Sequence, residues 1–168
     1  MLDVRWAVHR PTDYRLPVTV YPSWKRKLIF KQLLSEKEKT MSNSYIQNRT
    51  ILVIDDDVNL CKSLSIGLKR MGANVLTANN GKAGVKKMYD SRPDLIFLDV
   101  RMPEMNGWEA CRQIRMLSNV PIIMLTSLTD DNDIVRGLKY GADDFVSKPF
   151  SREVLVARAE AVLRRFHD

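Results

Sequence analysis

Apolar residues gather into three short continuous runs in the second part of the chain. The runs are Ile51-Leu52-Val53-Ile54, Leu95-Ile96-Phe97-Leu98 and Ile122-Ile123-Met124-Leu125. Continuous runs of this length are typical of strands that are buried on both faces, whereas half-exposed strands alternate apolar and polar residues. Two weaker segments, Asn74–Ala78 and Asp144–Ser147, include polar positions and are typical of sheet edges. The pattern therefore predicts three central strands and two edge strands.

Segments with a helical spacing of apolar residues lie between these strands. They are Val58–Met71, Gly81–Tyr89, Gly107–Leu117, Asp130–Tyr140 and Ser151–Phe166. Strands that alternate with helices of this length form parallel sheets through right-handed crossovers, so that helices cover both faces. We therefore expect an α/β fold, a doubly wound five-stranded parallel sheet of the flavodoxin-like (βα)5 type. With the two polar strands at the edges, the strand order is 2-1-3-4-5.

The first 48 residues have a different composition. They contain scattered prolines and no sustained period, and residues 1–50 carry ten Lys and Arg against four Asp and Glu, a net charge of +6. Residues 51–168 carry seventeen against sixteen, a net charge of +1, which does not favour a surface that binds nucleic-acid phosphates. We interpret residues 1–48 as a basic, disordered N-terminal extension and residues 49–168 as the folded domain.

Two alternatives stay open for the extension. Residues Trp24–Leu34 can form a short basic amphipathic helix for a membrane surface or a partner. Met41 lies just ahead of the domain, so residues 1–40 can instead be an over-extended reading frame or a dispensable leader. Cys61 and Cys111 lie in separate helical segments, and no apolar run approaches the length that spans a bilayer. We therefore expect a reduced, cytoplasmic protein without a membrane partner.

Polar side chains with potential chemistry follow four of the predicted strands. The first strand is followed by Asp55-Asp56-Asp57 and the third by Asp99, while Thr126 and Lys148 follow the fourth and fifth. In a sheet of this order, ligands bind beyond the carboxyl ends of the strands, near the switch between the first and third. Three neighbouring carboxylates stay ionised only if a cation offsets them. Oxygen ligands without His or Cys favour Mg²⁺, which can bridge a carboxylate and a transferring phosphoryl group.

Four motifs occur in order along residues 50–166. They are ILVIDDD, LDVRMPEMNG, PIIMLTS and GADDFVSKPF, and together they resemble the receiver domain of two-component response regulators. The last helical segment, SREVLVARAEAVLRR, resembles the final receiver helix of OmpR/PhoB-type DNA-binding regulators. The resemblance implies a phosphoprotein of signal transduction and transcription regulation. It would act as a phospho-acceptor switch, with at most autophosphorylation and autodephosphorylation activity, rather than as an enzyme.

The resemblance also implies a role for each residue of the predicted site. Asp99 would accept a phosphoryl group from a phosphohistidine of a sensor histidine kinase. Asp55 and Asp56 would bind Mg²⁺ together with Asp99 and the main-chain carbonyl of Arg101. Lys148, whose bond to the following proline is usually cis in the family, would pair with the phosphoryl oxygens.

A switch is implied on the neighbouring strands. Thr126 would move toward the phosphoryl group, which would let Phe145 rotate inward. The alternative for Phe145 is a plain core residue of the edge strand. We interpret Asp57 as the N-cap of the following helix, because Asp is common at that position. Ser127 is small, as access to the acceptor requires.

Relatives of the OmpR/PhoB type dimerise through the face of the fourth helix, fifth strand and fifth helix. The candidate interface residues here are Ile134, Asp143, Asp144, Val154, Arg158 and Arg165. At Ile134 and Val154 the family commonly has an ion pair, so we expect an apolar contact, unless both side chains pack inward within one protomer. DNA binding would need an output domain, which these 168 residues do not include. A truncated receiver and a stand-alone single-domain receiver both remain open.

Two other function classes share features with this sequence. A haloacid-dehalogenase-like phosphatase also uses Asp and Mg²⁺, but it needs a second Asp two residues after its nucleophile. Asp99 is followed at that spacing by Arg101, and Asp55 by Asp57 with too little chain for a cap domain. A phosphorylation-independent dimerisation module would be favoured only if Asp99 proved unreactive.

Overall fold

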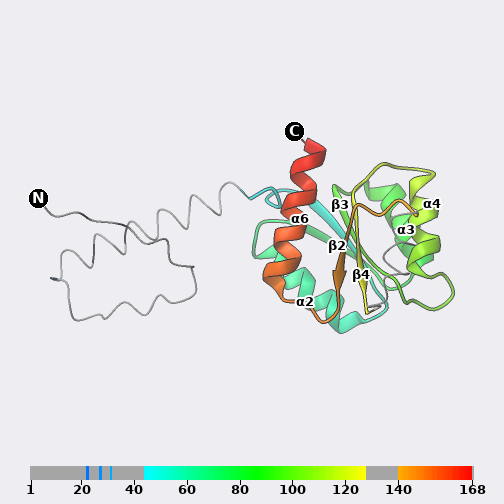
Figure 1. Cartoon of the computed structure of the whole chain (residues 1–168), viewed down its shortest axis with the longest axis horizontal. Coiled ribbons are helices and arrows are strands. Elements are labelled where there is room, and N and C mark those ends of the chain that lie inside the picture. The colour runs from blue at the N-terminus through cyan, green and yellow to red at the C-terminus, as the bar shows by residue number, and fades with distance from the viewer. Residues whose placement is uncertain (1–21, 23–26, 28–30, 32–43, 128–139, 168) are drawn as a thin grey trace, which may run out of the picture. The chain divides into compact units, whose positions relative to one another are not determined.

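The computed structural model describes residues 22, 27, 31, 44–127 and 140–167. The chain forms two compact units, Met1–Lys39 and Thr40–Asp168, and the labelled elements of Figure 1 belong to the second. The predicted helix Asp130–Tyr140 lies outside the described residues, apart from Tyr140.

A five-stranded parallel sheet forms the centre of the second unit. Its strands are β1 (Thr50–Ile54), β2 (Asn74–Ala78), β3 (Leu95–Asp99), β4 (Ile122–Thr126) and β5 (Asp144–Ser147). Their order is β2-β1-β3-β4-β5, with every neighbouring pair parallel, so the predicted sheet is confirmed. All residues of β3 and β4 are buried, whereas β2 and β5 keep exposed positions. The continuous apolar runs thus lie at the centre and the polar strands at the edges.

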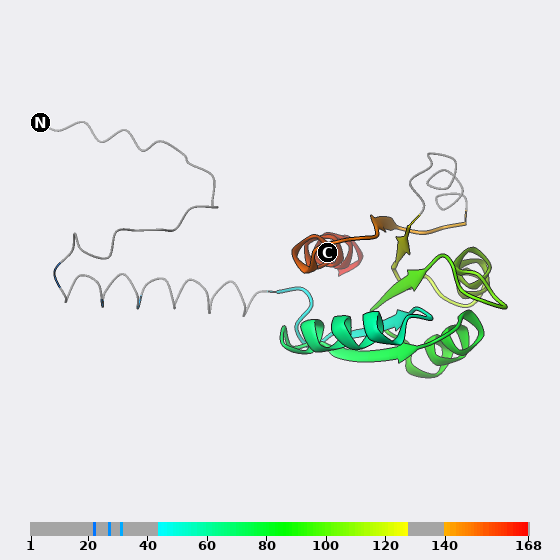
Figure 2. The same ribbon diagram turned by 90° about the horizontal axis from the view of Figure 1, so that it is seen from below.

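Helices cover both faces of this sheet. The described helices are α2 (Val58–Lys69), α3 (Gly81–Ser91), α4 (Gly107–Arg115) and α6 (Arg152–His167). Figure 2 shows α2 and α6 on one side of the sheet and α3 and α4 on the other, so the doubly wound arrangement is confirmed. None of the described helices combines the length and the apolar composition that crossing a membrane requires.

Polar side chains set where the helices begin. The carboxylate of Asp57 accepts hydrogen bonds from the main-chain N–H groups of Asn59 and Leu60 at 2.9 and 3.0 Å. Asp57 is therefore the N-cap of α2, as expected, and its side chain satisfies donors that have no partner within the helix. Asn106 caps α4 in the same way by accepting from the N–H of Glu109 at 3.0 Å.

Two core clusters fill the spaces between the sheet and the helices, because alternate residues of a strand face opposite sides. The cluster under α2 and α6 includes Ile51, Val53, Phe97, Ile123, Leu125, Leu64, Leu68, Leu155 and Leu163. The cluster under α3 and α4 includes Leu52, Ile54, Ile96, Leu98, Ile122, Met124, Met88, Ala110, Cys111 and Ile114. Each of these larger side chains stabilises the fold by about 1.5–3 kcal/mol through burial, so both layers hold the sheet rigid beneath its carboxyl ends.

Residues ahead of β1 also join the core. Ile46 is fully buried in the cluster under α2 and α6, and Tyr45 packs against the same cluster. The hydroxyl of Ser44 donates a hydrogen bond to the carboxylate of Glu160 on α6 at 2.6 Å. Residues 44–46 are thus packed with the domain rather than leading away from it.

Candidate functional site

The carboxyl ends of β1 and β3 bring two buried carboxylates together. Ile54 lies beside Leu98 in the sheet register, so Asp55 and Asp99 follow at the same level. Their exposed fractions are only 1% and 3%. The Nζ atom of Lys148, which follows β5, lies 2.7 Å from Asp55 Oδ2 and 2.7 Å from Asp99 Oδ1. One ammonium group therefore bridges both acids.

A third carboxylate belongs to this acidic site, which we define as Asp55, Asp56, Asp99 and Lys148. One ligand oxygen from each Asp lies within 4.8 Å of the other two, and Asp56 is the exposed member. When all groups are ionised, three carboxylates and one ammonium leave a net charge of −2. A divalent cation would neutralise that charge, and ligands that are all oxygen suit a hard ion. The residues present therefore fit a Mg²⁺ site.

The electrostatics of the acidic site also favour a bound cation. Burial raises the pKa of the Asp99 carboxyl, and although the hydrogen bond from Lys148 opposes this, the neighbouring charge of Asp55 adds to the increase. For Lys148, burial by itself lowers the pKa, but the hydrogen bonds to Asp55 and Asp99 outweigh it, so the pKa is raised overall. Lys148 therefore stays charged. The protein alone does not fully compensate the negative charge of ionised Asp99.

Main-chain contacts fix the position of Asp55. Its Oδ1 accepts a hydrogen bond from the N–H of Asp57 at 2.9 Å, which leaves Oδ2 aimed at Lys148. The thiol of Cys61 donates to the Asp55 carbonyl at 3.4 Å. Burial raises the pKa of Cys61 to about 11, so this thiol stays protonated at neutral pH and serves as a donor. A buried, protonated thiol is unreactive, so Cys61 has a structural role in this geometry.

Asp99 is fixed from the opposite side by the start of α4. The N–H of Gly107 donates to the carbonyl of Val100 at 2.9 Å. A Cβ atom at Gly107 would lie 2.1 Å from the Asp99 carbonyl oxygen, far inside van der Waals contact. Only glycine therefore lets α4 approach the acceptor this closely. A main-chain hydrogen bond from Arg101 acts on the Asp99 carboxyl and lowers its pKa, which puts the backbone of Arg101 beside the site.

Thr126 and Phe145 lie on the same face of the sheet. Phe145 is beside Met124 in the register, and Thr126 stands two residues after Met124 on β4. Thr126 is 4% exposed, and the main-chain N–H of Lys148 donates to its carbonyl at 2.6 Å. The peptide bond between Lys148 and Pro149 is cis. The structure thus brings Thr126 close to the Lys148 end of the acidic site, while Ser127 is exposed.

The predicted interface residues are partly engaged within the chain. Arg115 donates to Asp143 at 2.8 Å, and the same carboxylate accepts from the N–H of Ile122 at 2.8 Å. Arg158 pairs with Asp144 at 3.1 Å. The remaining candidates on α6 are exposed: Val154 is 48% exposed, and Arg165 donates a hydrogen bond to the Ala161 carbonyl of its own helix. Ile134 lies outside the described residues.

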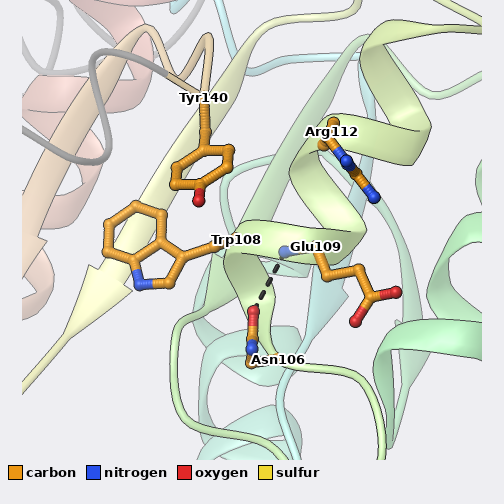
Figure 3. A pocket seen from close by; sticks show the side chains of 5 residues that line it. All are labelled: Asn106, Trp108, Glu109, Arg112 and Tyr140. Carbon is orange, nitrogen blue, oxygen red and sulfur yellow. Dashed lines mark hydrogen bonds between the residues drawn. The ribbon is translucent and has the colours of Figure 1, made fainter.

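Sequence reasoning missed an aromatic cluster that joins the first turn of α4 to β5 and is formed by Trp108, Tyr140 and Phe145. The rings of Trp108 and Tyr140 are stacked with centroids 5.9 Å apart, and those of Trp108 and Phe145 are tilted at 6.2 Å. Figure 3 shows Trp108 and Tyr140 at one side of a pocket. The available signal was a tryptophan directly after the Asn106-Gly107 helix start, but its partners are distant in sequence.

Comparisons with known proteins concern most of the second unit. A family model described as the response regulator receiver domain matches residues 51–160. The transcriptional regulatory protein AfsQ1 of Streptomyces coelicolor is 48% identical over 116 residues, which cover 69% of this chain and 52% of that protein. The DNA-binding response regulator MtrA of Mycolicibacterium smegmatis is 47% identical over 118 residues, or 70% of this chain and 52% of that protein. The chain thus spans about half the length of these curated relatives.

Solved structures resemble the same part of the chain. A two-component response regulator from Clostridium difficile has a TM-score of 0.70 at 33% identity, covering 72% of this chain and 100% of that one. The response regulator DrrB, an OmpR/PhoB homologue from Thermotoga maritima, has a TM-score of 0.65 at 36% identity, covering 71% of this chain and 54% of that one.

Proposed function

The chain belongs to the response regulator receiver domain family, and from this premise we propose that Asp99 accepts a phosphoryl group from a sensor histidine kinase. Receiver domains are partners of histidine kinases and are in general switches rather than enzymes. The observation that carries the proposal is the contact of Lys148 with both Asp55 and Asp99 at 2.7 Å, at the carboxyl ends of the strands. The same family match favours a receiver over the dehalogenase-like phosphatase.

In the proposed transfer, a carboxylate oxygen of Asp99 attacks the phosphorus of a phosphohistidine. The new O–P bond forms as the P–N bond breaks, and the imidazole leaves with the electron pair and takes up a proton. Lys148, already 2.7 Å from Asp99 Oδ1, is in reach of the arriving phosphoryl oxygens. Its raised pKa keeps it charged throughout. The buried location of Asp99 strengthens this interaction by excluding water.

Mg²⁺ is the cofactor of this proposal. Asp55, Asp56 and Asp99, with the main-chain carbonyl of Arg101, would hold it. When bound, the ion offsets the charge of the carboxylates and of the transferring phosphoryl oxygens. During the phosphoryl transfer, the hydrogen bond from the N–H of Asp57 keeps Asp55 Oδ1 in place. Lys148 would then contact the phosphoryl oxygens in place of Asp99 Oδ1.

Thr126 and Phe145 form the proposed switch. Thr126 is buried at the end of β4, and its hydroxyl would hydrogen-bond the phosphoryl group. Phe145 lies on the same face of the sheet and would rotate inward as Thr126 moves. The change would alter the face made by residues 130–140, β5 and α6, where we propose that two phosphorylated copies dimerise.

The proposed dimer surface combines an apolar and a charged part. Ile134 and Val154 would contact each other across the two-fold axis, and Val154 is 48% exposed and available. Arg158, now paired with Asp144, is exposed enough to exchange that partner for one on the second copy. Asp143 would form an ion pair with Arg165 of the second copy while it stays paired with Arg115 of its own chain.

The remaining expectations are part of the proposal. The receiver would comprise residues 49–168 with residues 44–46 packed against it, so the proposed basic extension ends before residue 44 rather than at residue 48. The protein would act in the cytoplasm. The names of the relatives describe a transcriptional regulator and a DNA-binding regulator. Any contact of this protein with DNA would run through an output domain rather than through the receiver itself.

Incubation with Mg²⁺ and acetyl phosphate, followed by intact mass, tests the proposed acceptor. We expect the wild type to gain one acid-labile phosphoryl group and Asp99→Asn to gain none, because an amide is a poor nucleophile. Asp57→Asn is the matched control, because Asp57 caps α2 and Asn is an equally good cap. Undiminished labelling of Asp99→Asn would overturn the assignment. An unreactive wild type would instead support a phosphorylation-independent dimerisation module.

A further inference from the structure

Trp108 lies at the centre of the aromatic cluster. Its ring is stacked on Tyr140 with centroids 5.9 Å apart and planes at 25°, and it meets Phe145 at 6.2 Å and 50°. Tyr140 comes from the connection before β5, Phe145 from β5 itself and Trp108 from the first turn of α4. The ring of Phe145, the proposed switch residue, therefore contacts α4, the helix whose first residue lies against Asp99.

The link from Trp108 to the acceptor is made of main-chain contacts. Trp108 follows Gly107, whose N–H donates to the Val100 carbonyl at 2.9 Å. Gly107 is pressed so closely on Asp99 that a Cβ atom would lie 2.1 Å from the Asp99 carbonyl oxygen. Contacts this tight transmit small displacements, because a packed interior has little free volume to absorb them. A shift in the backbone of Asp99 must therefore move the first turn of α4.

The cluster also has room to respond. Trp108 and Phe145 pack on one side against the buried cluster under α3 and α4. Trp108, but not Phe145, also lines a pocket of about 560 Å³, together with Asn106, Glu109, Arg112 and Tyr140. Figure 3 shows the stacked rings of Trp108 and Tyr140 bordering this space, with Glu109 and Arg112 on the other side of the helix turn. The indole can thus change its ring contacts without entering the core.

We propose that Trp108 is a positioning residue that holds Phe145 before phosphorylation and exchanges its ring contacts when Asp99 carries a phosphoryl group. The inference rests on the proposed function and extends it to a second connection between acceptor and switch. One connection runs through Thr126 and the neighbouring strands. The other runs from Asp99 through Gly107 to the indole, and both end at Phe145. Tyr140 is moved with the indole, so the change reaches the connection that precedes β5.

Tryptophan emission of the full chain tests this directly. The protein has three tryptophans, so the double substitution Trp6→Phe and Trp24→Phe leaves Trp108 as the reporter. Emission is recorded with Mg²⁺, before and after acetyl phosphate, while intact mass gives the phosphorylated fraction of the same sample. We expect the emission of Trp108 to change in proportion to that fraction. The same background carrying Asp99→Asn should show no change.

Two substitutions distinguish a ring contact from a general structural effect. Phe145→Leu should reduce the emission change at least about twofold at equal phosphorylation, because the indole loses its ring partner, whereas Phe145→Tyr should retain it. Tyr89→Leu is the matched control, since Tyr89 is a 65% exposed ring on α3, outside the cluster. Phosphorylated protein with unchanged emission, or a change that Phe145→Leu leaves intact, would overturn the inference alone. Protein that takes up no phosphoryl group would overturn the proposed function, and the inference with it.

Discussion

Asp55 and Asp99 share a single ammonium group, because Lys148 Nζ lies 2.7 Å from one carboxylate oxygen of each. Both carboxylates are almost fully buried, whereas Lys148 is 22% exposed at its side chain. Removing one partner of a buried ion pair costs much more than the pair itself contributes, since the remaining charges stay buried without compensation. The stability of the receiver and its proposed chemistry therefore depend on the same three groups.

Lys148→Met should destabilise the protein at pH 7. It leaves two buried carboxylates without their ammonium, and we expect the free energy of unfolding to fall by about 3 kcal/mol. Urea unfolding at pH 7 measures this, and Mg²⁺ should restore part of the loss by replacing the missing positive charge. Lys86→Met is the control, because Lys86 is an exposed residue of α3. Equal loss in both variants would contradict the role of Lys148.

The raised pKa of Asp99 predicts a pH dependence with a defined sign. An acid whose pKa is higher in the folded than in the unfolded state stabilises the protein below its unfolded value, here 3.8. That contribution is lost as the pH rises through the folded pKa. Asp99→Asn should therefore raise the free energy of unfolding at pH 7 without Mg²⁺, and the gain should vanish toward pH 3. Urea unfolding from pH 3 to pH 8 would refute this if the variant were less stable at pH 7.

Mg²⁺ should stabilise the wild type through the acidic site. A ligand that binds only the folded state at 100 times its dissociation constant adds about 2.7 kcal/mol to the free energy of unfolding. Asp56→Asn should lose most of this gain, because Asp56 is one of the three carboxylates within 4.8 Å of each other. Asp57→Asn, at the cap of α2, should keep it. Thermal unfolding in MgCl₂, compared with NaCl at equal ionic strength, gives the answer, and equal gains in both variants would exclude this site.

Gly107→Ala should be far more damaging than Gly67→Ala. At Gly107 the new methyl group would lie 2.1 Å from the Asp99 carbonyl oxygen, and backbone atoms cannot yield cheaply. At Gly67, inside α2, the nearest atom is the flexible Arg152 side chain at 3.3 Å, and Ala favours a helix by up to about 1 kcal/mol. We expect Gly107→Ala to lose about 3 kcal/mol or more and Gly67→Ala to change little. Urea unfolding of both, with similar results, would contradict the close approach of α4.

The fold and the acidic site could be predicted because short sequence patterns determine them. Ile51–Ile54 and Leu95–Leu98 are continuous because both faces of a central strand are buried, and strand order then follows from the polar edges. Parallel strands end at the same edge of a sheet, so Asp55 and Asp99 had to be neighbours. Short sequence patterns do not predict side-chain contacts between elements that are distant in the sequence.

The aromatic cluster and the role of Asp143 illustrate that limit. Trp108 stacks on Tyr140 only because α4 and the connection before β5 pack together. Asp143 accepts hydrogen bonds from Arg115 and from the main-chain N–H of Ile122. These partners come from separate parts of the sequence, so the set depends on how those parts pack. The family comparison suggested an acidic interface position, but it did not indicate these contacts within the chain.

Val154→Glu should weaken the proposed dimer of the phosphorylated protein. Val154 is 48% exposed on α6, and its burial in a two-fold interface would occur once in each copy. Covering the exposed half of an aliphatic side chain contributes about 1 kcal/mol to the free energy of association. A carboxylate at the same position would lose this contribution and add a desolvation cost. Exposed ion pairs such as Arg158 with Asp144 contribute only about 0–1 kcal/mol. We therefore expect at least about a tenfold increase in the dimer dissociation constant. Sedimentation of phosphorylated samples measures it, with Tyr89→Glu on α3 as a control that also replaces an exposed apolar side chain by a charge. An unchanged equilibrium in Val154→Glu would show that dimerisation does not use this face of α6.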